Sequence, residues 1–398
     1  MPRFEPFRGL RYDPERVRID QVIAPPYDVI SSAERVHLVS RSPFNSVRLE
    51  LPEPDLRSGR DRYELAAELL ASWLEGGVVV PDETPTLYPY RMTLADGRQT
   101  TGVLGALGLA EPGPDSDVLP HEQTLPKPKS DRLDLLRATR TNLSPIWGLS
   151  LAQGLTATFE PIEPPLLDAF DDDGVRHELW ALDEPDVIDA VGRAVASAPV
   201  VIADGHHRYE TARTFQREVR AANGDRPGPH DLVLALVVEL AEDQLTVGPI
   251  HRTFTDLPAE VDLAAEFHKW FEVVRAGDAS ERVVGALGDS QSLALLTPAG
   301  AWMLTPRPEL SEAAGSDLDS SFIELAMRDI PHTSTHQHTW REAFAAVESG
   351  QAQAAVLLRP VSVAQIAEWA DARRKMPPKT TYFSPKPRTG MVFRSLDH

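Results

Sequence analysis

The chain has 398 residues, a formal net charge of −20 at pH 7 and a hydrophobic content of 42%, which supplies enough apolar material for two or three folded domains. The negative charge argues against a general nucleic-acid-binding surface, which needs clustered lysine and arginine, and the lack of cysteine excludes disulfides, thiolate metal sites and cysteine nucleophiles. No apolar run approaches the roughly 18 residues of a transmembrane helix and the first residues lack an apolar signal core, so we expect a cytoplasmic protein without a membrane partner.

The first 110 residues mix helical and strand patterns. The segment IAPPYDVI, residues 23–30, predicts extended backbone because its two prolines fix φ, and it presents Tyr27 and Asp28 after them. A purely structural turn is the alternative interpretation of this segment. Periodicity and turn residues elsewhere predict a strand at 45–51, a helix at 60–75 ended by glycines, and a hairpin of 87–94 with 100–109.

A basic segment, LPHEQTLPKPKSDRLDLLRATRTNLSPIW, follows the hairpin. His121 and Glu122 fall in a loop between prolines, Ser130 is placed to cap a helix, and the cationic side chains include Lys127 and Arg132. A cationic cluster in an acidic protein favours an anionic ligand, and a carboxylate beside it can act as a general base on a hydroxyl. A solvated charged helix is the alternative.

The centre of the chain is VVIADGHHRYETA, residues 200–212. Its β-branched residues predict a buried strand that ends near Asp204, and Gly205 then turns the chain. A helix is predicted from His206 to the Asn-Gly pair at 223–224, which is a typical helix end. The sequence therefore predicts a strand, a glycine turn and a helix N-terminus in succession.

Three cationic or potentially cationic side chains, His206, His207 and Arg208, fall in the first turn of that helix. The helix dipole is positive at this end and the first backbone N–H groups lack partners, so a bound anion would resolve the conflict. The pattern indicates a phosphate site in the general sense. The alternative is an ordinary helix capped by Asp204, with surface histidines.

The remaining segments continue the mixed pattern. His332, His336 and His338 favour a polar loop and helix start over a metal site, because no carboxylate is placed to complete a ligand set. The patterns predict a short helix, an Asp-rich turn and a strand within 166–182, helices at 185–198, 263–271, 322–328 and 340–347, a strand at 232–240 with a return at 245–254, a hairpin at 293–304, a strand at 354–358 and a helix around Ile366 and Trp369.

The last part of the chain is a basic, proline-rich tail, KMPPKTTYFSPKPRTGMVF, which contains Lys379 and Lys386. The apolar triplet at 391–393 predicts a closing strand that would fold the tail back over the body. We therefore expect an ordered basic loop that reaches an anionic ligand. A disordered tail is the alternative.

Five blocks taken in order resemble a known family: IAPPYDVI, the pair His121-Glu122, DRLDLLRAT, IADGHHRYETA and MPPKTTYFSPKPRTG. They look like the blocks of the bacterial and archaeal domain-of-unknown-function family ten-fifteen, and the match spans essentially the whole chain. That family name carries no established activity, so it implies a common fold but no reaction.

A more distant resemblance concerns DGHHR at 204–208 and the upstream PHE at 120–122. This pair is similar to the signature of the ADP-dependent free serine kinases of the ParB/sulfiredoxin-like superfamily. The resemblance implies that Glu122, beside His121, is the catalytic base on an acceptor hydroxyl. It also implies a nucleotide phosphate grip, formed by Asp204, Gly205, His206, His207 and Arg208.

These observations lead to one expected fold and one leading function. We expect a mixed α/β, or α+β, protein with a ParB/sulfiredoxin-like nucleotide-binding core, and not a Rossmann or Walker fold, whose glycine motifs are absent. The expected domains are an N-terminal α+β region at 1–110, the core at 111–255 and a C-terminal α+β region at 256–398, whose tail returns to the site.

The leading function is a phosphotransferase that uses ADP or ATP with Mg²⁺ on a small hydroxyl metabolite, with free L-serine as one possible acceptor. The residues expected to neutralise developing charge are Lys127, Lys129, Arg132, Lys379, Lys386 and Arg388. Two alternatives stay open: a nucleotide-binding regulator without turnover, and a metal-dependent phosphoester hydrolase that uses the histidines and carboxylates of the two motifs.

Overall fold

The computed structural model describes residues 1–54, 59–111, 113, 115–122, 130–159, 164–278, 283, 287 and 291–397. They form two compact units: unit 1 comprises Met1–Thr246, Ala370–Arg373 and Pro385–His398, and unit 2 comprises Val247–Trp369 and Arg374–Ser384. The division expected between residues 110 and 111 lies inside unit 1, where strands from both sides of it share one sheet.

Unit 1 is built on a nine-stranded mixed sheet with the order β6-β11-β8-β12-β5-β4-β10-β9, and β1 pairs with one end of β5. The pairs β6–β11 and β8–β12 are parallel, and the other pairs are antiparallel. The strands are β1 Phe4–Glu5, β4 Tyr88–Thr93, β5 Gln99–Gly108, β6 Val118–Pro120, β8 Ile146–Ser150, β9 Leu167–Phe170, β10 Arg176–Leu179, β11 Val200–Asp204 and β12 Leu232–Glu239.

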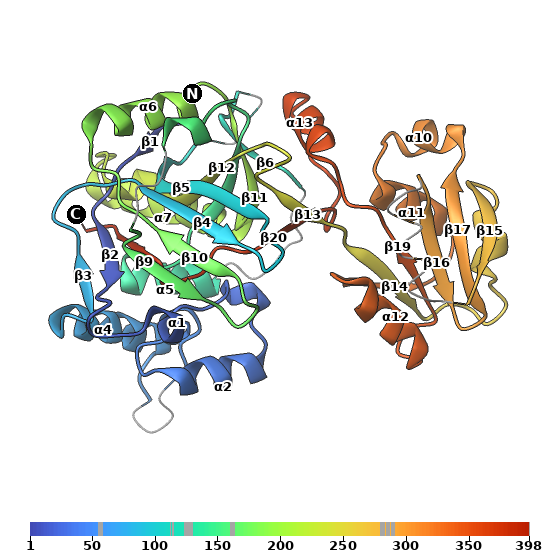
Figure 1. Cartoon of the computed structure of the whole chain (residues 1–398), viewed down its shortest axis with the longest axis horizontal. Helices are drawn as coiled ribbons and strands as arrows, with labels where there is room; N and C mark the ends of the chain where they lie inside the picture. The colour runs from blue at the N-terminus through green and yellow to red at the C-terminus, as the bar shows by residue number, and fades with distance from the viewer. Residues whose placement is uncertain are drawn as a thin grey trace. The chain divides into compact units, whose positions relative to one another are not determined.

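Some helices of unit 1 pack on this sheet, and others lie at one end of the unit. Helices α6 and α7 bury apolar side chains such as Val191 and Tyr209 in one core with the sheet, while α1, α2 and α4 gather at one end of the unit (Figure 1). The helices are α1 Ile19–Val22, α2 Ser32–Arg41, α3 Val47–Glu50, α4 Arg62–Glu75, α5 Ser130–Thr139, α6 Pro185–Ala196 and α7 His206–Asn223, with 3-10 turns at Tyr27–Val29, Thr156–Thr158 and Pro229–Asp231.

A second, four-stranded sheet in unit 1 joins the two ends of the chain. Its order is β3-β2-β21-β7, so the last strand pairs with β2 near the N-terminus and with β7. The predicted return of the tail is confirmed, although its strand lies two residues beyond the predicted start. The strands are β2 Gly9–Tyr12, β3 Val79–Pro81, β7 Thr141–Asn142 and β21 Phe393–Ser395.

Unit 2 is an antiparallel sheet with a core on each face. The strand order is β15-β17-β16-β19-β14-β18; Phe267 and Phe322 pack in one core, and Ala343 and Val347 in the other. Its strands are β13 Thr246–Gly248, β14 His251–Thr255, β15 Phe271–Gly277, β16 Leu293–Thr297, β17 Gly300–Pro306, β18 Thr333–Gln337, β19 Ala354–Leu357 and β20 Tyr382–Ser384. Its helices are α8 Leu263–Phe267, α10 Pro308–Ala314, α11 Asp319–Met327, α12 Trp340–Glu348 and α13 Val363–Asp371.

The expected mixed α+β class is confirmed, and most predicted helices and hairpins are present. The strand predicted at 45–51 is wrong, because the side chain of Asn45 accepts from the backbone N–H of Val47 and starts the short helix α3. The helix predicted near 166 is also wrong. The segment 167–170 is β9, whose residues alternate between buried and exposed as a strand with one covered face requires.

Two further expectations are corrected in the second half of the chain. The return strand at 245–254 does not pair with β12, because β5 and β8 already occupy both edges of β12. The chain instead passes into unit 2, where β14 pairs with β18 and β19. His336, expected in a loop, lies in the β-branched strand β18. No helix among the described residues is long and apolar enough to cross a membrane.

The far end of α7 is fixed by a buried carboxylate. Asp231 accepts from Arg220 and Gln216 on the helix and from the backbone N–H of Gly228. Burial alone would raise the pKa of Asp231, but the Arg220 guanidinium and the other donors outweigh it and lower the pKa to about 2. The folded state therefore favours the ionised carboxylate.

We expect Asp231→Asn to destabilise the protein above pH 4 and to lose that effect in acid. Because the pKa is lower in the folded state than the ordinary 3.8, the carboxylate's contribution is present above pH 3.8 and disappears as the pH falls towards 2. Urea unfolding of both proteins between pH 2.5 and 7 measures this difference. The exposed Arg220 partner Asp225 gives the control Asp225→Asn, for which we expect little change at any pH. A loss of unfolding free energy in Asp231→Asn that stays constant across the pH range would contradict the stabilising role of the ionised carboxylate.

Candidate functional site

Two adjacent parallel strands bring the two predicted motifs together. Strands β6 and β11 pair in parallel with Ile202 opposite Pro120, and residues that follow neighbouring parallel strands emerge at the same edge of a sheet. His121 follows β6 and its Nδ1 lies 2.6 Å from the carbonyl oxygen of Ile202. Its ring centroid lies 5.1 Å from that of His206 at the start of α7. The His-Glu pair and the DGHHR segment therefore form one cluster.

Strand β11 leads into helix α7 through an irregularity in the strand register and a glycine. The register between β11 and β8 shifts between Ile202 and Asp204, and such an irregularity re-aims the side chains at the strand end. Gly205 has φ of +88° and precedes α7 as its N-cap residue. An added Cβ there would lie 3.1 Å from the Cα of Ile146, so both the conformation and the space require glycine.

Asp204 is held between two cations. One carboxylate oxygen accepts from Nζ of Lys386 at 2.8 Å, and the other from Nη2 of Arg208 at 2.8 Å. Burial would raise the pKa of Asp204, but the charges of Lys386 and Arg208 outweigh it and lower the pKa. Arg208 also donates through Nη1 to the carbonyl oxygen of Pro145. The guanidinium of the motif is thus fixed from two sides.

His121 and Glu122 form a pair in which one group can pass a proton to the other. Nε2 of His121 lies 3.5 Å from Oε2 of Glu122. Burial lowers the pKa of His121, which favours the neutral ring. The Nδ1 atom faces a carbonyl oxygen and must donate to it, so the neutral ring keeps Nε2 unprotonated toward the glutamate.

The tail reaches this cluster by a backbone bridge and a buried polar network. Thr389 pairs with Ala24 in the IAPPYDVI segment. Arg388 donates through Nε to Asp171 at 2.8 Å, and the same carboxylate lies 2.9 Å from Nε2 of His177. Burial would raise the pKa of Asp171, but His177 and Arg388 lower it well below its usual range. This network positions the segment between β20 and β21, which carries Lys386.

Sequence reasoning missed the role of this network. It treated Asp171 as part of a turn, and the turn is present, but the carboxylate is also the buried partner of Arg388. The tyrosine and histidine beside it, Tyr90 and His177, are joined by a 2.7 Å hydrogen bond. Both lie on strands with no motif of their own, so only their pairing across β4 and β10 could have revealed them.

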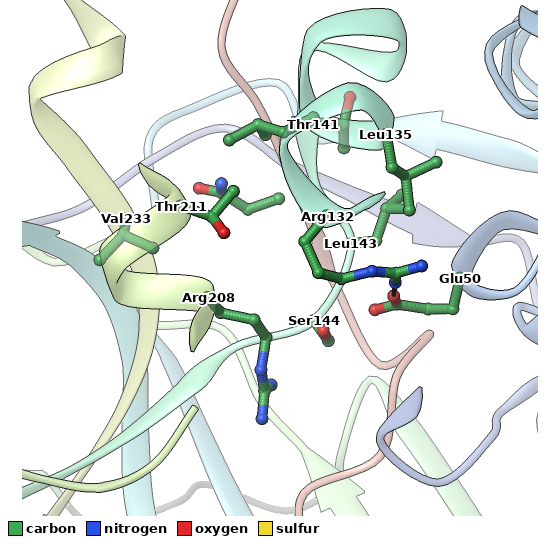
Figure 2. A pocket seen from close by; sticks show the side chains of 11 residues that line it. Glu50, Arg132, Leu135, Thr141, Leu143, Ser144, Arg208, Thr211 and Val233 are labelled. Atoms are coloured by element: carbon green, nitrogen blue, oxygen red, sulfur yellow. Dashed lines mark hydrogen bonds and ion pairs between the residues drawn. The ribbon is translucent and has the colours of Figure 1, made fainter. Parts of the chain in front are cut away.

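The segment around Tyr27 and the helix α3 complete the site on another side. Arg132, predicted to bind phosphate, lies over the Tyr27 ring with 4.4 Å between its Cζ atom and the ring centroid. It donates to Glu50 at 2.9 Å and to Asp131 at 2.8 Å. A pocket with a volume of about 50 Å³ is lined by Glu50, Arg132 and Arg208, among other residues (Figure 2).

The residues predicted from the sequence lie in different parts of the structure. His121, Glu122, Arg132, Lys386 and the DGHHR residues all lie in unit 1, in the surroundings described above. Lys127 and Lys129 fall outside the described residues, and Arg388 contacts the carboxylate of Asp171. Lys379 belongs to unit 2, so its predicted role at this site stays a prediction. Among the described residues, no group of three or more histidines and carboxylates is arranged to hold a metal ion.

Comparison with known proteins places the chain in a family. A family profile described as "Protein of unknown function (DUF1015)" matches residues 4–327, and no curated protein matches the chain. Similar solved structures include a conserved hypothetical protein from Pyrococcus furiosus, with 12% identity, a TM-score of 0.36, and coverage of 69% of this chain and 90% of that chain.

Two other similar structures are those of named proteins. One is a free serine kinase in complex with AMP, with 11% identity, a TM-score of 0.39, and coverage of 70% of this chain and 88% of that chain. The other is SbnI with a C-terminal truncation from Staphylococcus aureus, with 12% identity, a TM-score of 0.38, and coverage of 73% of this chain and 86% of that chain.

The substitution Gly205→Ala should destabilise the protein and displace Arg208. The left-handed conformation costs about 1–2 kcal/mol for a residue with a Cβ, and the 3.1 Å approaches to Ile146 and Arg208 add about 1–3 kcal/mol of overpacking. Gly154 has a similar φ of +79° but no atom within 4 Å of an added Cβ, so Gly154→Ala is the matched control and should show only the conformational cost. Chemical denaturation measures both. Equal losses of unfolding free energy for the two variants would show that the close packing at Gly205 does not contribute to the effect.

Proposed function

The chain belongs to the DUF1015 family of proteins of unknown function, and from that premise we propose that it transfers a phosphoryl group from ADP or ATP to the hydroxyl of a small metabolite. The observation that carries the proposal is the parallel pairing of β6 with β11. It puts a carboxylate that can accept a proton, Glu122, at the same sheet edge as a helix N-terminus that can hold phosphate. Phosphoryl transfer requires mainly this positioning and a stabilised charge.

In the proposed mechanism the phosphates lie at the first turn of α7. The backbone N–H groups there, the positive end of an 18-residue helix and the side chains of His206, His207 and Arg208 favour a multiply charged anion. Lys386, 2.8 Å from Asp204, adds a further cation at the same place. Asp204 keeps Lys386 and Arg208 in position and balances part of their charge before the nucleotide binds.

Glu122 receives the hydroxyl proton in this mechanism. The bond from phosphorus to the nucleotide oxygen breaks while a bond from phosphorus to the acceptor oxygen forms, and the acceptor proton passes to Glu122. The unprotonated Nε2 of His121, 3.5 Å away, can take that proton onward. His121 is therefore assigned as the partner of the base.

A divalent ion such as Mg²⁺ would neutralise phosphate charge in this reaction. The described carboxylates of the cluster suit an ion held chiefly by the nucleotide, because Asp204 already accepts from two cations. Arg208 and Lys386 would then contact the phosphate oxygens that the ion leaves free.

Phosphorus NMR of the purified protein tests the proposal directly. The mixture contains Mg²⁺ and ADP or ATP with L-serine, and then with a panel of small hydroxyl compounds. We expect a new phosphomonoester signal with a matching loss of nucleotide for at least one acceptor. Unchanged nucleotide across the panel, in protein that binds it by thermal shift, would favour the regulator without turnover. Release of free phosphate without an acceptor would favour the hydrolase.

The substitution Glu122→Gln should lower turnover by about 10²–10⁴-fold, the usual contribution of general base catalysis, and leave nucleotide binding unchanged. Product formation followed by phosphorus NMR and nucleotide affinity from calorimetry separate the two effects. The exposed Glu111, paired with Arg213, gives the matched control Glu111→Gln, which should keep full turnover. Full turnover of Glu122→Gln would remove Glu122 from its assigned role.

A further inference from the structure

A small pocket with both polar and apolar side chains in its lining lies on the side of Arg208 that faces α3 and α5. Glu50 comes from α3, Arg132 from α5, Arg208 and Thr211 from α7, and Ser144 from the turn before β8. In Figure 2 the carboxylate of Glu50 points toward Arg132, and Ser144 lies between this pair and Arg208. The pocket has a volume of about 50 Å³, which admits only a small compound.

Two residues that line this pocket carry buried polar atoms without a partner. Glu50 is only 3% exposed, and its Oε2 accepts from Arg132 at 2.9 Å. Its Oε1 is buried and has no hydrogen-bond partner among the described residues, and the same is true of Nε of Arg208. Leaving a buried charged group partly unsatisfied is costly, so a ligand that reaches these two atoms from the pocket would find one acceptor and one donor.

The charges around the pocket are already matched. Arg132 contacts the carboxylates of Glu50 and Asp131, and Arg208 contacts that of Asp204. A ligand with a net charge would leave that charge unmatched in a buried place, which is unfavourable. A net-neutral ligand that donates to Glu50 and accepts from Arg208 satisfies both open atoms without this penalty.

We propose that this pocket binds the acceptor of the phosphoryl transfer, and that the acceptor is a small, net-neutral hydroxyl compound that donates a hydrogen bond to Glu50 and accepts one from Arg208. The identification of the ligand as the acceptor rests on the proposed function, whereas the binding site itself does not depend on it. Polyols and zwitterionic hydroxy amino acids share the required chemistry. Arg208 joins the pocket to Asp204 and hence to the start of α7, where the phosphates are proposed to lie.

Calorimetric titration with four matched probes tests the ligand class. The probes are glycerol, L-serine, the anion D-glycerate and the cation ethanolamine, each added without nucleotide and with saturating AMP, which has no transferable phosphoryl group. We expect glycerol or L-serine to bind more tightly than both charged probes, and the tighter of these two identifies the source. Binding of none of the four in either condition, or tighter binding of a charged probe, would overturn the proposal.

The substitution Glu50→Gln tests the assigned contact. The amide can still accept from Arg132 through its oxygen but presents an NH₂ donor where Oε1 was an acceptor, so the preferred neutral ligand should bind about ten- to a hundred-fold more weakly. AMP affinity serves as the internal control and should not change. Unchanged affinity for the neutral ligand in a folded Glu50→Gln protein would exclude the assigned contact.

A second pair of variants changes the protein less and tests the pocket even if Glu50→Gln misfolds. Thr211→Val keeps the shape of a pocket residue and removes its hydroxyl, and should weaken neutral-ligand binding about two- to tenfold. Thr214, on the same helix, bonds to the carbonyl oxygen of Glu210 and does not line the pocket, so Thr214→Val should bind as the parent does. Equal affinities of these two variants would count against the pocket.

The failure of this inference and the failure of the proposed function give different results. Neutral-ligand binding that depends on Glu50, with no phosphoryl product in the presence of ADP or ATP, would keep the binding site and reject the transfer reaction. Phosphoryl transfer to an acceptor with unchanged KM in Glu50→Gln would keep the reaction and place its acceptor elsewhere.

Discussion

A partly buried carboxylate between two cations fixes the candidate site. Asp204 ends a sheet strand, Arg208 lies one turn into the following helix, and Lys386 comes from a segment 182 residues later in the chain. A buried charge that loses its partner costs several kcal/mol, so each of the three side chains constrains the other two. The positive φ of Gly205 and the shifted register of β11 then follow as the backbone geometry that lets Asp204 face both cations.

The position of Lys386 depends in turn on how the tail is attached. Arg388 pairs with the buried Asp171, which also contacts His177, and Thr389 bridges to Ala24. The next strand, β21, then closes a sheet with the N-terminal β2. The tail is thus held just after the lysine by contacts to β2, the IAPPYDVI segment and the turn between β9 and β10. Segments that are far apart in the sequence meet in one place because each contributes one partner of a buried pair.

The sequence predicted local features well and long-range pairings poorly. The strand, glycine and helix around Gly205 were predictable because β-branched residues, a glycine and a helix stop follow one another without interruption. Hydrophobic alternation could not separate β9 from a short helix, since four residues fit both periods. The helix α3 was missed because it starts with a hydrogen bond from the backbone N–H of Val47 to the side chain of Asn45.

The site itself was predicted in part. The proximity of the His-Glu pair to DGHHR follows from two parallel strands that single-sequence patterns cannot pair, and it was reached only through a resemblance. Glu50 gave no signal, because it lies in a segment predicted as a strand and its importance comes from burial beside Arg132. The role of Asp171 likewise depends on a partner 217 residues away. Burial and pairing of charges are properties of the fold, and a sequence shows only the residues that could take part.

On the proposed function, the two sides of Arg208 select ligands of different charge. At the start of α7, Arg208 and Lys386 share one carboxylate, Asp204, and the helix end adds positive potential. This side favours an anion. On the other side every cation already contacts a carboxylate, so a neutral ligand is favoured. A nucleotide and a neutral hydroxyl compound could therefore not exchange places. The same guanidinium would then contact both ligands.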